Sequence, residues 1–304
     1  MQEEKSKWVK YGSIFAIVIM VVSAVLVGLI GFGGGNDNET ELLLSDIPGA
    51  QANFTFKNAK DGSTHVPEGA LSINILKIYP DDATDKGLKQ MLPGVDADKV
   101  MIAFYPSGAV EYYSLTENNN ASITLVGKPQ YDKHENHNIL FISPAQRVIA
   151  GNPLILASFY NYVADNTLAK KVVDVLAGKS SGSTDFKDIL AYADDTEIYD
   201  EIIVYKANTG SAYEKYYERS SSFINMTTFE LGFELESIVL KPDAGMKAQL
   251  KSLSENATGS NKISITEDDN VLKTYIDSVD LEDFFTDREA LYKIISDNTA
   301  QSAA

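Results

Sequence analysis

The longest run of apolar residues lies close to the N-terminus. Residues 13–32 carry no charged side chain, and Ser13 and Ser23 are their only polar ones. A helix rises about 1.5 Å per residue, so roughly 20 residues cross a hydrocarbon core about 30 Å thick. The pattern therefore predicts one transmembrane anchor over residues 13–32.

The residues that flank this run predict its orientation. Lys5, Lys7 and Lys10 precede it, whereas residues 33–39 contain no positive charge. Because lysine is enriched on the cytoplasmic side of membranes, we expect residues 1–12 to be cytoplasmic and the C-terminal region to be extracytoplasmic. This arrangement predicts a single-pass protein of the cell membrane.

A processed leader is the competing interpretation of the N-terminus. The apolar region of a signal peptide is typically about 7–15 residues long, shorter than this run. Tyr11-Gly12-Ser13 resembles the processing site of a prepilin-type leader, but Ile17 stands where pilin-like subunits usually carry Glu. Residues 33–48 are expected to form a flexible tether, because its first part, residues 33–40, is Gly-rich and then polar.

Beyond the tether, strand-like and helix-like patterns follow one another. Leu71, Ile73 and Ile75 alternate with polar residues as in a half-buried strand, and the apolar run 100–105 predicts a buried strand whose hairpin partner is 110–115. Helical spacing is found around Leu168, Val172 and Leu176 and over residues 84–92, 246–253 and 284–295. This mixture predicts the α+β fold class.

Two stretches about 100 residues apart share one order of residues. Thr84-Asp85, Asp98 and Gly108 in the first correspond to Thr184-Asp185, Asp200 and Gly210 in the second. The match predicts two related helix-strand-hairpin modules over residues 49–150 and 151–262, followed by a C-terminal helical segment over 263–304. The alternative explanation is that any two segments of mixed helices and strands share such strand-forming and turn-forming residues.

The composition narrows the class of partner. The 304 residues include 43 acidic and 26 basic side chains, which gives a formal net charge of −17. Such a chain repels polyanions, so no nucleic-acid partner is expected. Cysteine is absent, which excludes a disulfide scaffold, a thiolate zinc site and a cysteine nucleophile. Five Asn-X-Ser/Thr sequons are glycosylation candidates, at Asn38, Asn53, Asn120, Asn225 and Asn256.

The most compact group of potential metal ligands lies in a polar stretch of the first module. His134, Glu135 and His137 offer two imidazoles and one carboxylate, donors that suit Zn²⁺ or Ni²⁺. Their spacing differs from H-E-x-x-H, in which one helical turn separates the imidazoles. A solvated loop is the alternative, and the sequence predicts no organic cofactor.

These observations favour a non-catalytic binding or scaffold protein, anchored in a membrane through residues 13–32, that engages an envelope protein or an exported polypeptide. The first alternative is a metal-dependent hydrolase that uses His134, Glu135 and His137. The second is a self-assembling surface subunit, pilin-like or lattice-forming, processed at Gly12.

Overall fold

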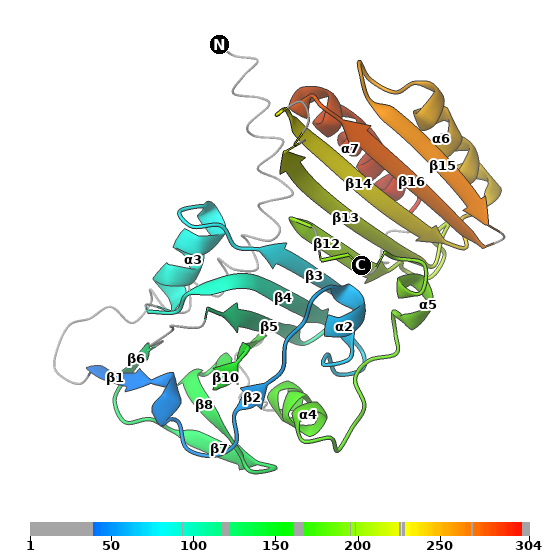
Figure 1. Ribbon diagram of the computed structural model, residues 1–304. Coiled ribbons are helices and arrows are strands. Elements are labelled where there is room, and N and C mark those ends of the chain that lie inside the picture. Colours follow the sequence, from blue (N-terminus) through cyan, green and yellow to red (C-terminus); the bar gives the residue numbers. More distant parts are fainter. Residues whose placement is uncertain are drawn as a thin grey trace.

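One antiparallel sheet dominates the structure. The computed structural model describes residues 39–299 except 93, 117–121, 161–166, 195, 198, 225, 227, 228 and 269. Strands make up 41% and helices 24% of the described residues. Figure 1 shows the sheet running from the helix pair α6 and α7 at one end to the β7–β8 hairpin at the other.

The large sheet has twelve strands in the described part of the chain, and all neighbours are antiparallel. In spatial order they are β15 (Lys262–Asp268), β16 (Val271–Ser278), β14 (Leu231–Leu240), β13 (Lys215–Ile224), β12 (Glu201–Lys206), β3 (Ser72–Lys77), β4 (Ala97–Tyr105), β5 (Gly108–Leu115), β11 (Leu154–Phe159), β9 (Gln146–Ile149), β8 (His137–Ser143) and β7 (Tyr131–His134).

Two short pairs of strands and several helices complete the described structure. The pairs are antiparallel β1 (Glu39–Leu43) with β6 (Ser122–Val126), and parallel β2 (Ala52–Asn53) with β10 (Gly151–Asn152). A 3₁₀ turn covers Leu44–Asp46. The helices are α2 (Ala59–Ser63), α3 (Ala83–Met91), α4 (Thr167–Leu176), α5 (Lys187–Leu190), α6 (Ala244–Glu255) and α7 (Leu281–Asp297).

Apolar side chains divide the interior into three clusters. The first packs α2, α4 and α5 against one face of the sheet, and the second packs α3 and the β1–β6 pair against the opposite face of β4, β5 and β11. The third lies between α6, α7 and the strands β13, β14 and β16. The middle of the sheet is thus covered on both faces, which explains the continuous apolar run in β4.

Aspartate side chains begin three of the helices. Asp82 accepts a hydrogen bond from the Asp85 amide at 2.7 Å at the start of α3, and Asp243 accepts one from the Met246 amide at 2.8 Å at the start of α6. Asp280 does the same for the first turn of α7. Because free amides at a helix N-terminus need acceptors, part of the acidic excess has a structural role.

The predicted α+β class was wrong, because the described residues form mostly one large antiparallel sheet with few helices. β12 returns to pair with β3, with Ile202 opposite Ile75 and Val204 opposite Ile73. If β3 and β12 belonged to separate sheets, each would have an open edge with unpaired backbone groups. Their pairing instead joins the two sets of strands into one sheet. Residues 262–278, placed largely in the expected helical segment, form the β15–β16 hairpin.

The predicted membrane span, residues 13–32, lies outside the described residues. Among those described, α7 is the longest helix with 17 residues, and no helix is long and apolar enough to cross a membrane. A crossing needs about 20 mostly apolar residues. The predicted anchor, single-pass topology and extracytoplasmic localisation are therefore not supported.

Candidate binding sites

The three residues predicted as metal ligands lie on the β7–β8 hairpin. His134 and His137 face each other across the end of the two strands, and Glu135 and Asn136 form the connecting turn. Both turn residues have positive φ, 45° and 66°, the geometry of a tight two-residue hairpin turn. The hairpin fixes the two histidines on one cross-strand pair.

Each of these side chains is engaged separately. The Nε2 atom of His134 lies 2.7 Å from Oδ1 of Asp174 on α4, and Nδ1 of His137 lies 3.1 Å from the backbone oxygen of Glu135. The Glu135 carboxylate lies 3.7 Å from the Lys179 ammonium. No group of three His, Cys, Asp or Glu side chains in the described ranges is arranged to hold a metal ion. The metal-site hypothesis therefore gains no support.

Two of the five sequons lie in the described residues. Asn53 on β2 and Asn256, directly after α6, are both exposed. Asn38, Asn120 and Asn225 lie outside the described residues. Exposure is necessary for glycosylation, so the first two keep their status as candidates.

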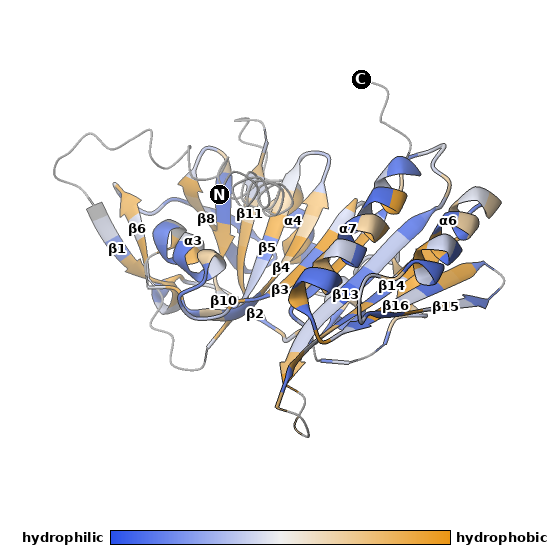
Figure 2. Ribbon diagram, turned by 90° about the horizontal axis from the view of Figure 1, so that it is seen from above, coloured by the Kyte–Doolittle hydropathy of each residue, from blue (hydrophilic) through white to orange (hydrophobic). Residues whose placement is uncertain are grey.

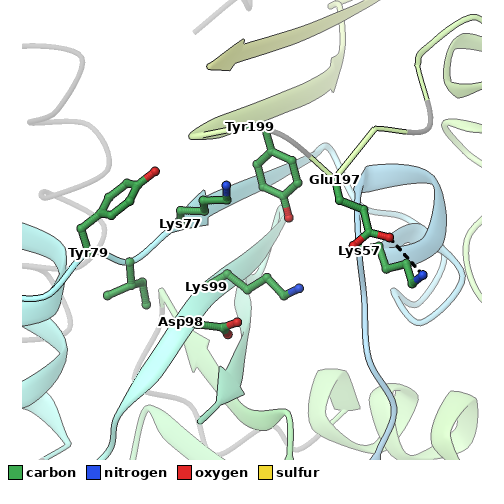
Figure 3. A pocket seen from close by; sticks show the side chains of 8 residues that line it. Lys57, Lys77, Tyr79, Asp98, Lys99, Glu197 and Tyr199 are labelled. Carbon is green, nitrogen blue, oxygen red and sulfur yellow. Dashed lines mark ion pairs between the residues drawn. The ribbon is translucent and has the colours of Figure 1, made fainter. Parts of the chain in front are cut away.

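A pocket opens where β3 and β12 join the two ends of the sheet (Figure 3). Its volume is about 230 Å³, which is below the roughly 300–1,000 Å³ of pockets that hold drug-sized ligands. Residues from the approach to α2, the ends of β3 and β4 and the segment before β12 line it: Lys57, Lys77, Ile78, Tyr79, Asp98, Lys99, Glu197 and Tyr199. The pocket thus has room only for a ligand smaller than a drug-sized molecule.

Two lysines of this pocket are direct cross-strand neighbours. Lys77 at the end of β3 pairs in register with Lys99 on β4. The Lys77 ammonium lies 5.5 Å from the centroid of the Tyr199 ring, and the Lys99 ammonium lies 5.2 Å from that of Phe56. Cations over aromatic faces gain a modest attraction, so ring contacts hold both side chains in place.

The other polar groups of the pocket carry both signs of charge. Lys57 forms an exposed ion pair with Glu197 at 3.0 Å. Burial, with a smaller contribution from the charges of Asp98 and Glu197, raises the pKa of Tyr199 to about 12. Its phenol therefore stays protonated at neutral pH and can donate a hydrogen bond.

Asp200 connects one wall of the pocket to the hairpin β13–β14. Its Oδ1 atom accepts a hydrogen bond from the Tyr79 hydroxyl at 2.5 Å, and its Oδ2 atom accepts two from the amide and hydroxyl of Ser222 at 2.6 and 2.7 Å. Burial, followed by the bond to Asp200, raises the pKa of Tyr79 to about 12. The side chain of Asp200 thereby links β12 to β13 one step beyond their last residue pair, Glu201 with Ser220.

The second candidate site is the tip of this hairpin, formed by the described residues Ile224, Met226 and 229–231. β12 ends its pairing with β13 at Ser220, and β16 ends its pairing with β14 at Phe233. Beyond these residues no other described strand pairs with β13 or β14, and the two strands form a ribbon that closes with Ile224 opposite Leu231. In Figure 2 the ribbon extends past the neighbouring strands at the lower edge of the view.

Large apolar side chains at this hairpin tip are exposed to solvent. The exposed fractions are 61% for Ile224, 77% for Met226, 78% for Phe229 and 50% for Leu231. Phe229 also has a φ of +57°, a conformation that bulky residues rarely adopt. Single exposed apolar residues are ordinary, but a cluster on a projecting element is typical of an interaction surface.

The packing below the tip fixes the ribbon. A Cβ atom at Gly232 would lie 2.5 Å from the Phe223 ring, so the ring covers the cross-strand glycine. Such coverage pins the register of a ribbon. Phe223 and Gly232 therefore hold the strands in register directly below the tip.

Sequence reasoning missed both sites, for different reasons. The pocket depends on a strand register that brings Lys77 opposite Lys99, and no local pattern reports such a pairing. The hairpin tip had a local signal: the segment 223–231 contains five large apolar residues where a turn is expected to be polar.

Comparison with known proteins adds no assignment. The chain matches no protein-family model, and no curated protein matches its sequence. The functional argument therefore depends on the geometry of the two sites.

Proposed function

We propose that this chain is a non-catalytic binding protein that docks onto another polypeptide through the tip of hairpin β13–β14. The observation that carries the proposal is the group of exposed side chains Ile224, Met226, Phe229 and Leu231 at the end of a projecting ribbon. Large apolar anchors that enter a pocket of the partner supply most of the energy of typical protein interfaces.

The charges around the tip define the chemistry of the partner. No lysine or arginine is present from Ser220 to Leu240, whereas Glu230 and Glu234 are exposed close to the apolar cluster. Opposite potentials favour association, and like charges oppose it. The partner is therefore a protein with an apolar cleft and a basic rim, and anionic surfaces are disfavoured.

The test compares the tagged wild-type chain with a variant that carries Met226→Ser and Phe229→Ser. Both side chains are exposed, so their replacement changes stability by roughly 0.5 kcal/mol or less. Loss of two anchors is expected to weaken a captured complex at least about 30-fold, measured by titration with the purified partner.

Val126→Ser is the matched control, because Val126 is 84% exposed and lies on β6, away from the hairpin. This variant is expected to bind the partner as the wild type does. Equal affinity of the wild type, the double variant and the control for every captured protein would exclude the tip as the docking site.

A further inference from the structure

The pair Lys77 and Lys99 is electrostatically unfavourable. Like charges directly opposite each other on neighbouring strands destabilise a sheet, and these two residues are in register on β3 and β4. Neither forms an ion pair within the described part of the chain, although acidic residues outnumber basic ones by 43 to 26. Because neither ammonium group is paired with a described carboxylate, both are available to an external anion.

The Tyr199 hydroxyl is a third possible donor to an anion in this pocket. Tyr199 is only 1% exposed, yet its hydroxyl forms no hydrogen bond with any residue that the structure describes. The hydroxyl oxygen borders the pocket, where it can donate a hydrogen bond. Figure 3 shows this hydroxyl directed into the space that the lysines surround.

We propose that this pocket binds a small molecule through an oxyanion group, a carboxylate or a phosphate, held between the ammonium groups of Lys77 and Lys99 with the Tyr199 hydroxyl as third donor. The volume of about 230 Å³ limits the ligand to a small molecule.

The charge balance of the lining agrees with an anion. Three lysines face two carboxylates, and the exposed pair Lys57 and Glu197 is internally neutral. Asp98 then offsets one of the two remaining lysines and leaves one positive charge for the ligand. Lysine serves here as a point charge, which both carboxylates and phosphates accept.

The experiment titrates the full chain with inorganic phosphate and, separately, with acetate, at constant ionic strength, by isothermal calorimetry. Saturable binding of either probe is expected, and the tighter one identifies the oxyanion class. Lys77→Gln together with Lys99→Gln should weaken binding at least about tenfold, because two charge-assisted contacts are lost. Tyr199→Phe keeps the ring under Lys77 and should weaken binding several-fold.

Lys128→Gln is the control, since it removes the same charge from an exposed position between β6 and β7. A second readout separates binding from folding. Lys99→Gln removes the repulsion and should raise the unfolding midpoint of the free chain while it weakens the ligand. Absence of saturable binding to the wild type, or unchanged affinity in the double lysine variant, would overturn the proposal without affecting the role of the hairpin tip.

Discussion

The two ends of the sheet differ in how their faces are covered. Around β4, β5 and β11, apolar side chains pack on both faces. Around β14 and β16, one face packs on α6 and α7 along the strands. The other face is apolar only at one end, at Ile238, Leu240 and Val271, and farther along it carries the charged cross-strand neighbours Arg219 and Glu236, so we call this the singly covered end. The doubly covered end is stabilised mainly by apolar burial, and the singly covered end also requires satisfied charges.

β4 and β12 belong to the two stretches of sequence that share one order of residues, and they lie symmetrically about β3. β4 and β12 are both antiparallel to β3 and lie on its two sides. Val100 and Ile102 of β4 contribute to one core, whereas Ile202 and Val204 of β12 contribute to the core on the opposite face. A half-turn about the axis of β3 produces this exchange of faces, and the duplication stays a prediction.

The largest expected effect is on the charged network under α7. The Nη2 atom of Arg288 lies 2.7 Å from a carboxylate oxygen of Glu201 and 2.7 Å from one of Glu218. Arg288→Met would leave Glu218, which is 1% exposed, without its cation. Breaking a buried ion pair typically costs about 3–5 kcal/mol, and we expect a loss of this size in urea unfolding.

Lys293→Met on the exposed side of the same helix is the control for Arg288→Met. It should change the free energy of unfolding by roughly 0.5 kcal/mol or less. A loss below about 1 kcal/mol for Arg288→Met would show that apolar packing of α7 suffices, and the contrast between the two ends would disappear.

A buried carboxyl at the doubly covered end gives the next largest effect. Glu111 accepts a hydrogen bond from the Tyr113 hydroxyl, but complete burial raises the pKa of Glu111 to about 7. Because the folded pKa exceeds the unfolded value, the folded state binds more protons in this range, and stability falls as pH rises from about 4.5 through 7. This group alone should lower the free energy of unfolding by about 2–3 kcal/mol between pH 5 and 8.

Glu111→Gln removes the titration and keeps an acceptor for Tyr113. The difference between the unfolding free energies of the wild type and Glu111→Gln should therefore change with pH by about 2–3 kcal/mol. A difference that is constant from pH 5 to 8 would mean that Glu111 is hydrated in the folded state and that this end tolerates a charge.

Local patterns were sufficient for individual elements of this fold. The alternation at Leu71, Ile73 and Ile75 marks β3, the run 100–105 lies within β4, and the helical spacing near the C-terminus belongs to α7. The predicted start at residue 284 is three residues late, because Asp280 caps the helix. Apolar periodicity and capping chemistry are local, so a sequence expresses them directly.

Long-range pairing could not be predicted in the same way. The partner of β3 on its second side is β12, and nothing in either strand specifies the other. β15 has apolar positions only at Ile263 and Ile265 on the side of α6, so its signal is too weak to identify. The lysine pocket depends on these pairings, which places it beyond local pattern analysis.

The hairpin tip allows a smaller effect to be tested at the singly covered end. Phe229 has a φ of +57°, a conformation that destabilises an L-residue by roughly 1–2 kcal/mol. Phe229→Gly should therefore raise the free energy of unfolding by about 0.5–1 kcal/mol after the greater entropy of glycine is included. The same change should abolish capture of the partner, because the anchor is lost.

Met226→Gly is the comparison for Phe229→Gly, since it removes another exposed apolar side chain from the same tip. It should weaken the complex without stabilising the chain. A destabilisation by Phe229→Gly would show that the ring packs on the ribbon, and the tip would then be a structural closure of the hairpin.

The smallest expected effect concerns an exposed ion pair at the singly covered end. The Lys241 ammonium lies 2.9 Å from a Glu214 carboxylate oxygen, and both side chains are about half exposed, at 53% and 52%. Solvent screens such a pair, so Lys241→Gln should cost less than about 0.5–1 kcal/mol in urea unfolding, and less at high salt. At this end, the buried ion pairs of Arg288 would then contribute strongly to stability, whereas the exposed pair of Lys241 and Glu214 would not. The difference between them is burial. A cost near that of Arg288→Met would mean that charge pairing itself, independent of burial, holds β13 to β14.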